Sequence, residues 1–217
     1  MLKTLGFLPR RRDLDRAAFR EYYERRHAPF ALEHIRVFAK YVRNHVVYAA
    51  PQEPPFDTVS EFWFDDASTA QAIGAWLATP AGAVLRDDEA KFMDRPQIAA
   101  CAVEEHILLG PPRGFEPGPV RKSGWLVMGG ELDRDELRAW CETIVEGDRP
   151  NLVRAALDIP VSPTPTHLPL RALLWLWPRA DDRLNGPAAS AIAETSVLRL
   201  GFDAIETDPA RLRDPPP

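Results

Sequence analysis

The sequence predicts an α+β fold in which two βαββαβ units pair through their sheets to form a barrel. Strand and helix patterns follow this order in the first half of the chain, and the order returns more loosely in the second. A proline-rich stretch at residues 110–119 separates the halves. The chain has 217 residues, which is enough for two domains of about 100 residues each. We therefore expect one domain at residues 1–110 and a second at residues 120–208.

The first half contains four predicted strands and two helical regions, the second of which is divided into two stretches. β-branched and aromatic residues predict strands at residues 2–8, 40–49, 58–65 and 97–109. Asp15 is suited to cap a helix that is predicted to end at His27, because Ala28-Pro29 follows. Further helical stretches are predicted at residues 67–77 and 82–93. This order is the ferredoxin-like pattern.

The second half repeats the pattern with weaker signals. Strands are predicted at residues 123–129, 151–161, 170–178 and 196–207, and helices at residues 131–145 and 184–195. Asp133 is suited to cap the first of these helices, with Glu136 three residues later as in a capping box. The triplet Leu14-Asp15-Arg16 recurs as Leu132-Asp133-Arg134, each time between a strand and a helix. The matching order indicates a duplication.

Two four-stranded sheets from one chain can cover each other's open faces. A sheet with helices on one face leaves its other face to be covered, and a second sheet does this. The sequence therefore predicts tandem ferredoxin-like repeats that pair as an α+β barrel, an intramolecular pseudo-dimer that leaves further homodimerisation open. An enclosed apolar space between the sheets would hold a small ligand.

The composition excludes several classes of partner. The formal net charge of −5 argues against a general nucleic-acid binder. No stretch approaches the roughly 20 apolar residues of a membrane span. Cys101 and Cys141 lie in different halves without metal-ligand spacing, which fits a reducing cytoplasm. We expect a cytoplasmic protein without nucleic-acid or membrane partners.

His27 is the first candidate for chemistry. An imidazole titrates near neutral pH and can both accept and give a proton, and the dipole at a helix C-terminus favours its protonated form. The alternative is a histidine that caps the helix by binding its last carbonyls. Spacing alone favours the capping role.

His45 is the second candidate. Tyr41, Arg43 and His45 share one face of the predicted strand, whereas Asn44 and Tyr48 share the other. Either face could line the barrel, and in the alternative the strand is an edge strand whose polar side chains face water. The hydroxyl of Tyr41 and the amide of Asn44 are suited to bind a carbonyl or phenol oxygen.

The remaining histidines and motifs favour neither a metal nor a cofactor. His34 is expected on the surface, His106 in a structural pair with a neighbouring carboxylate such as Glu104, and His167 in a loop without a role. No spacing joins the histidines into a metal site, and no phosphate-binding or dinucleotide motif is present.

Aromatic residues occur in both halves of the chain. Tyr23, Trp63 and Phe92 belong to the first half, and Trp175 and Trp177 share one strand face in the second. Packing in the core is the ordinary explanation. If they line a cavity instead, they would suit a flat aromatic or polyketide-type ligand.

Five segments of the first half resemble the EthD family of dimeric α+β-barrel proteins. They are "FREYYERRHAPF", "YVRNHVV", "EFWFDD", "DEAKFMD" and "EEHILL", which occur in the expected order within residues 1–109. The second half departs from the pattern, because it has no counterpart of "HAP" or "RNH". The resemblance therefore implies that the second half is a degenerate repeat forming the other wall of the barrel.

The resemblance also implies an activity. It implies a cofactor-free enzyme, a lyase or isomerase, acting on a small aromatic, lactone or polyketide-type metabolite by isomerisation, cyclisation, dehydration or decarboxylation. His27 and His45 would transfer protons, and Tyr23, Tyr41, Asn44, Trp63 and Phe92 would contact the substrate. The alternatives are a non-catalytic protein that binds a hydrophobic metabolite and a cofactor-free quinol monooxygenase, since the fold alone does not choose among them.

Overall fold

The computed structural model describes residues 1–179 and 195–213. The chain divides into two compact units, each discontinuous in sequence. The first unit comprises residues 1–45, 55–100 and 205–217, and the second comprises residues 46–54 and 101–204. The domain boundaries expected at residues 110 and 120 stay a prediction.

The first unit contains the strand and helix order that its sequence predicts. Its elements are β1 (Leu2–Leu8), α1 (Arg16–Tyr22), the π-helix η1 (Tyr23–His27), α2 (Ala28–His34), β2 (Lys40–Ala50), β3 (Thr58–Phe64), α3 (Ala67–Ala78), α4 (Ala83–Glu89) and the 3-10 turn η2 (Arg95–Gln97). The strand β4 (Ala99–Leu109) then leads into the second unit, and β2 likewise continues past His45 into it.

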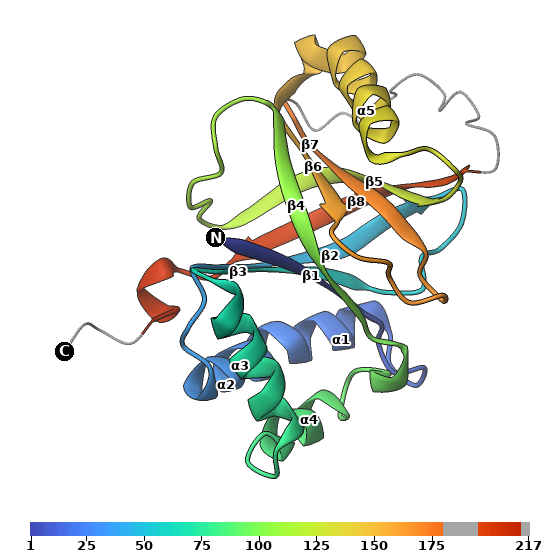
Figure 1. Cartoon of the computed structure of the whole chain (residues 1–217). Helices are drawn as coiled ribbons and strands as arrows, with labels where there is room; N and C mark the ends of the chain where they lie inside the picture. Colours follow the sequence, from blue (N-terminus) through green and yellow to red (C-terminus); the bar gives the residue numbers. More distant parts are fainter. Residues whose placement is uncertain (180–194, 214–217) are drawn as a thin grey trace. The chain divides into compact units, whose positions relative to one another are not determined.

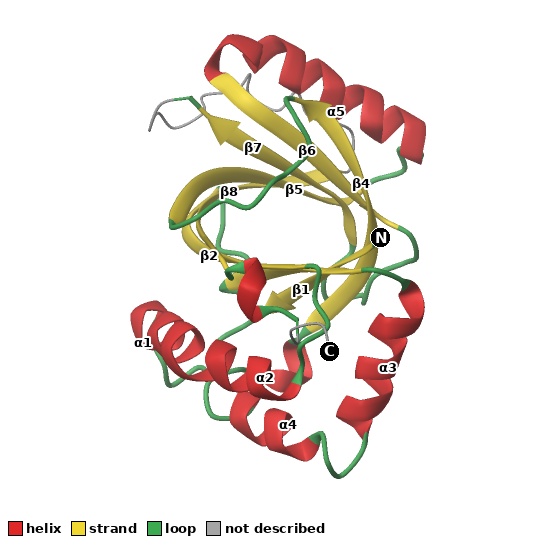
Figure 2. Ribbon diagram, turned by 90° about the vertical axis from the view of Figure 1, so that its left-hand side faces the viewer, coloured by secondary structure: helices red, strands yellow, loops and turns green. Residues whose placement is uncertain are grey.

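The sheet of the first unit has β3 at its centre. β3 pairs antiparallel with β1 and with β2, so that Ser60 lies opposite Gly6 on one side and Arg43 on the other. The helices α1 to α4 cover one face of this sheet (Figure 2). A strand presents alternate side chains to opposite faces, so every second residue of β2 and β3 points toward the helices.

The second unit is built on the same principle with one described helix. Its elements are β5 (Pro119–Gly129), α5 (Arg134–Asp148), η3 (Arg149–Asn151), β6 (Leu152–Pro160), β7 (Leu170–Pro178) and most of β8 (Thr195–Glu206). β7 pairs antiparallel with β5 and β6, and α5 buries Leu137, Cys141 and Ile144 against this sheet (Figure 1). Asp133 caps α5 in a capping box with Glu136, as predicted.

The eight strands are ordered β1-β3-β2-β8-β5-β7-β6-β4 in a closed barrel. The predicted mixture of helices with a β-barrel is therefore confirmed. Most of the helix expected at residues 184–195 falls outside the described residues. The tandem repeat accordingly stays a prediction.

The helical stretch that begins at Arg16 does not end at His27, so this prediction is wrong. The π-helix η1 widens the turn, with the N–H of Ala28 donating to the carbonyl of Tyr23, and α2 follows directly. Pro29 lies in the first turn of α2, where a missing N–H costs little. His27 is consequently inside a helical stretch and is not a C-terminal cap.

The C-terminal segment returns to the first unit and completes it. The N–H of Thr207 donates to the carbonyl of Tyr41 at 3.0 Å, and Arg213 pairs with Asp65 at 2.7 Å. Leu212 is 1% exposed and packs within the hydrophobic core of that unit. Residues from both ends of the chain thus build the first unit.

Both cysteines are buried free thiols. Burial raises the pKa of Cys101 and of Cys141 to about 12 in each case, so both are protonated at neutral pH. Buried, protonated thiols are poor nucleophiles, which gives them a packing role.

Within the described part of the chain, no helix combines the length and apolar character needed to cross a membrane.

Candidate functional site

An apolar cavity of about 240 Å³ lies between the sheet and the helices of the first unit. Its walls come from β1, β2, β3, the π-helix η1 and the helices α2, α3 and α4, with apolar side chains that include Leu8, Leu32, Ile35, Phe38, Phe62 and Phe64. The ligand space expected between two sheets concerns both units together and stays a prediction. The cavity described here belongs to the first unit alone.

His27 lines this cavity and is held by Asp88. Its side chain is 8% exposed, and Nδ1 lies 2.9 Å from Oδ2 of Asp88 in α4. With an ionised Asp88, the N–H of Nδ1 donates a hydrogen bond to the carboxylate, so in the neutral ring the lone pair is on Nε2. A histidine oriented by a carboxylate in this way is the arrangement of a general base.

Asp88 is stabilised as a carboxylate by three donors. Burial alone would raise the pKa of Asp88, but hydrogen bonds from His27, Tyr22 and Lys91 outweigh it and lower that pKa. The hydroxyl of Tyr22 donates to Oδ1 at 2.7 Å, and Nζ of Lys91 lies 3.1 Å from the same oxygen. Asp88 therefore remains ionised at neutral pH and keeps His27 in one orientation.

Three hydroxyl groups form a second polar element at the cavity. The hydroxyl of Tyr23 lies 2.8 Å from that of Tyr41 and 2.8 Å from Oγ of Ser60. Burial raises the pKa of Tyr23 well above its usual range and that of Tyr41 to about 12, although the charge of Arg43 opposes the second rise. Both phenols are protonated at neutral pH and act as hydrogen-bond donors.

The π-helix brings Tyr23 and His27 to the same place. Both residues belong to η1, their rings are 5.5 Å apart, and both line the cavity. The wide turn aligns residues four apart more closely than an α-helix does, and such turns are frequent at functional sites. The base and the hydroxyl donors therefore face one space.

His45 is buried in a separate network behind Tyr41. Its Nε2 lies 2.7 Å from Glu24 and its Nδ1 lies 2.8 Å from Thr58, so both ring nitrogens are engaged. Burial lowers the pKa of His45, although Glu24 opposes this effect. Glu24 also accepts a hydrogen bond from Arg43 at 2.8 Å. The structure thus places His45 beside the hydroxyl cluster but not at the cavity wall.

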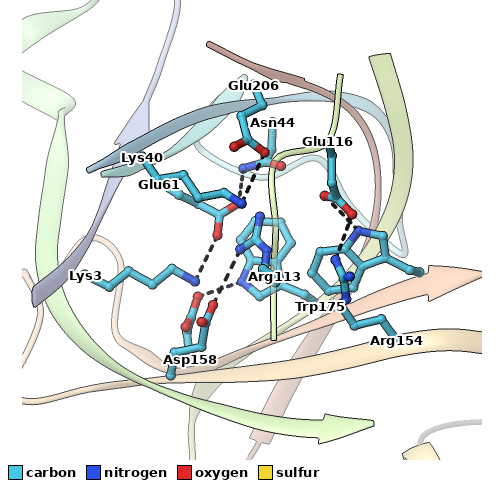
Figure 3. Close-up of polar contacts among 12 residues, drawn as sticks. Lys3, Lys40, Asn44, Glu61, Arg113, Glu116, Arg154, Asp158, Trp175 and Glu206 are labelled. Carbon is cyan, nitrogen blue, oxygen red and sulfur yellow. Dashed lines mark hydrogen bonds and ion pairs between the residues drawn. The ribbon is translucent and has the colours of Figure 1, made fainter. Parts of the chain in front are cut away.

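Asn44 and Trp63 lie on the opposite face of the sheet. Asn44 donates to Glu61 at 2.9 Å, and Glu61 pairs with Lys3 at 2.9 Å (Figure 3). Lys3 also lies 4.6 Å from the ring centre of Trp63. Neither Asn44 nor Trp63 lines the cavity that His27 faces, so the structure does not bring them together with it.

Phe92 supports the site without lining the cavity. Its ring is 4.9 Å from that of His27 and 5.5 Å from that of Tyr23. Phe92 is fully buried, and its contacts hold the rings of His27 and Tyr23 in place. Of the seven predicted site residues, Tyr23, His27 and Tyr41 therefore line the cavity, and Phe92 and His45 pack next to them.

Three other candidate residues lie in the second unit and contact side chains of that unit: His106, Trp175 and Trp177. Nε1 of Trp175 donates to Asp158 at 2.7 Å, and Trp177 lies near Glu116 (Figure 3 shows Trp175, Asp158 and Glu116). His106 lies 3.8 Å from Glu104, a loose pair of the kind that its sequence predicts.

Sequence reasoning missed Asp88, Ser60 and Glu24. Asp88 is 61 positions from His27, and no local pattern connects them. The segment "DEAKFMD", which begins at Asp88, belongs to the family resemblance and is the one sequence signal that points to this residue.

Comparison with solved structures shows the fold. The crystal structure of a protein from Fusobacterium nucleatum, provisionally named a monooxygenase, has a TM-score of 0.50 and 8% identity, and covers 94% of this chain and 91% of its own. A similarly named protein from Lactobacillus acidophilus has a TM-score of 0.46 and 10% identity, with 95% and 99% covered. No curated protein matches this sequence.

The family comparison concerns the unit that contains the cavity. The model described as EthD domain matches residues 11–96, a segment that includes η1, β2, β3 and α4. His27, Asp88, Tyr23 and Tyr41 all lie within it. The match to the EthD domain model thus falls in the half of the chain whose segments resemble that family.

Proposed function

We propose that the protein is a small-molecule enzyme that moves a proton at a carbon next to a carbonyl, without a cofactor. The observation that carries this proposal is the His27–Asp88 pair at the wall of an apolar cavity. Nε2 of His27 would take the proton, and Asp88 would stabilise the imidazolium that forms.

The hydroxyls of Tyr23 and Tyr41 supply the matching electrophilic element. Removing a proton next to a carbonyl places negative charge on the carbonyl oxygen, and a preorganised donor in a site without water stabilises that charge strongly. Isomerisation, cyclisation, dehydration and decarboxylation of a β-oxo compound all pass through such an enolate. Oxygenation of a quinol by O₂ without a cofactor is a variant in which the same base takes the phenolic O–H proton of the substrate.

Solvent exchange tests proton transfer without knowledge of the natural substrate. In D₂O, we expect the wild-type protein to accelerate deuterium incorporation at the carbon between the ring and the carbonyl of 2-tetralone, followed by NMR. His27→Gln should reduce the catalysed rate by about 10²-fold or more, because general-base catalysis contributes that much. Asp88→Asn should also reduce it, since the imidazole loses its orienting carboxylate.

The matched control is His34→Gln. His34 is exposed in the same helical stretch and bonds only locally, to the carbonyl of Phe30 at 3.0 Å. Equal rates for wild type and for the His27 and His34 variants would disprove the proposal. If the wild type binds 2-tetralone but exchange stays at the rate without protein, the alternative gains support: a protein that holds a hydrophobic metabolite for a partner enzyme.

We also propose that the two halves are diverged ferredoxin-like repeats. Asp15 and Asp133 support this, because each belongs to a Leu-Asp-Arg triplet and each caps the helix that follows its strand. An experimental structure in which β1, α1, β2 and β3 superimpose on β5, α5, β6 and β7 would bear out the duplication. Different crossing angles of helix and sheet in the two halves would contradict it.

A further inference from the structure

The cavity contains very few charged groups. Among the described residues that line it, the acidic or basic side chains are those of His27 and Glu89 alone. Glu89 lies 2.9 Å from Nε of Arg95, and His27 is already paired with Asp88. A bound carboxylate would therefore meet the carboxylate of Glu89, and no lysine or arginine among the described lining residues. Burying an ion without a partner is unfavourable.

The nearest guanidinium cannot serve as that partner. Arg43 is buried behind Tyr41, and it bonds Glu24 at 2.8 Å and Thr207 at 2.5 Å. Its charged carbon lies 4.6 Å from the ring centre of Tyr41. The positive charge of Arg43 is balanced by Glu24, so it is not available to a carboxylate in the cavity.

The cavity has room for two fused rings. An engineered apolar cavity of about 150 Å³ in another protein binds benzene, and the cavity here measures about 240 Å³. Tyr41 and Phe62 both line the cavity, and their rings are stacked at 4.8 Å with an angle of 14° between their planes. Aromatic side chains at a cavity wall favour flat ligands, because aromatic rings prefer offset stacking.

The hydroxyl cluster of Tyr23, Tyr41 and Ser60 has one more proton than its internal hydrogen bonds use. Tyr23, Tyr41 and Ser60 hold three hydroxyl protons but share only two contacts, at 2.8 Å each. One proton therefore remains for a donation outside the cluster. When Ser60 donates to Tyr23 and Tyr23 donates to Tyr41, the remaining proton is that of Tyr41, which lines the cavity, so a ligand oxygen there can accept it.

We propose that this cavity selects an uncharged two-ring phenol or cyclic ketone, with its oxygen on the hydroxyl of Tyr41, and rejects carboxylates of the same size. This assignment deepens the proposed function, on which it rests, by stating the charge and shape of the substrate, and it removes decarboxylation from the proposed reactions because a decarboxylase acts on a carboxylate. Binding can nevertheless be measured separately from turnover.

Three probes of one size test the assignment. At pH 7, 2-naphthol is uncharged and carries the oxygen, naphthalene lacks the oxygen, and 2-naphthoate carries a charge. Equilibrium dialysis should show 2-naphthol binding about 2- to 10-fold more tightly than naphthalene, the gain from one hydrogen bond. 2-Naphthoate should bind at least ~100-fold more weakly than 2-naphthol, because its charge is buried without a partner.

Two variants connect these affinities to the cavity. Tyr41→Phe should leave the affinity for naphthalene unchanged and remove the advantage of 2-naphthol. Gly6→Val should weaken both ligands at least ~10-fold, because Gly6 lines the cavity and the added methyl groups would fill it. A Cβ at Gly6 meets Phe62 at 3.6 Å and Leu8 at 3.7 Å, which is ordinary contact, so the variant should fold. Tyr48→Phe, on an exposed part of β2, is the matched control.

The outcomes separate this inference from the proposed function. Equal affinities for 2-naphthol and 2-naphthoate, an unchanged preference in Tyr41→Phe, or no binding of 2-naphthol to the wild type would overturn the inference. If exchange of 2-tetralone proceeds while 2-naphthoate binds as tightly as 2-naphthol, the inference alone fails. If the three affinities follow the expected order while exchange is absent, the proposed catalysis alone fails.

Discussion

At the residue scale, His27 and His45 differ in function because their ring nitrogens have different hydrogen-bond partners. His27 uses one nitrogen to bind Asp88 and has no second hydrogen-bond partner among the described residues. His45 uses both nitrogens, toward Glu24 and Thr58. Chemistry needs a nitrogen that a ligand can reach, and this distinguishes the first from the second.

His45 should make the stability of the protein depend on pH. Burial lowers the pKa of His45, so the unfolded chain binds its proton at a higher pH than the folded chain does. Its stabilising effect is complete above the unfolded pKa of about 6.5 and declines as the pH falls below it. Glu24, whose pKa is also lowered because hydrogen bonds from His45 and Arg43 outweigh its burial, adds a similar loss below about pH 4.3.

We therefore expect the thermal midpoint of the wild type to fall between pH 7 and pH 5. His45→Gln retains a donor and an acceptor but does not titrate, so its midpoint should change less over the same interval. His34→Gln, at an exposed position, should follow the wild type. Parallel profiles for the wild type and His45→Gln would show that another group controls this range.

At the element scale, local sequence patterns predict the regular strands and helices well, but they do not predict the π-helix η1. β1 was expected at residues 2–8 and lies at Leu2–Leu8, because alternating side chains and the following turn define a strand locally. The extra residue in η1 has no local signature, and Pro29 suggested a helix end because proline usually marks one. The wide turn is fixed by tertiary packing of Tyr23 and His27 against Phe92.

The cap of α5 should make a measurable contribution to stability. Oδ1 of Asp133 accepts from the N–H groups of Asp135 and Glu136 at 2.9 Å each. Asp133→Ala leaves these donors without that acceptor and should lower the free energy of unfolding by about 1 kcal/mol, measured by urea denaturation. Asp133→Asn keeps an acceptor and should cost little. Equal losses in both variants would assign the effect to charge and not to the cap.

At the scale of the whole molecule, segments distant in sequence meet in the first unit. Its described parts come from residues 1–45, 55–100 and 205–213. Sequence patterns predicted its strands and helices, but not that the chain would return after the second unit to complete it. The same limit applies to the site, because the partnership of His27 with Asp88 depends on the tertiary fold.

The returning segment should stabilise the first unit. Leu212 is buried in its core, so Leu212→Ala should cost about 2 to 5 kcal/mol through lost contacts and a new cavity, measured by chemical denaturation. Arg211→Ala, at the exposed neighbouring position, should change stability by less than about 0.5 kcal/mol. If both substitutions cost equally little, the segment is not needed for folding.

The return of residues 205–213 to the first unit also has a consequence for the order of folding during synthesis. A nascent chain usually folds its N-terminal domain first. Here residues 11–96 leave the ribosome long before Thr207 and Leu212 exist, so the domain must wait, incomplete, while residues 101–204 are translated. We expect the growing chain to remain sensitive to protease until these last residues emerge, and a ribosome-bound chain ending at residue 204 to be cleaved faster than the released protein.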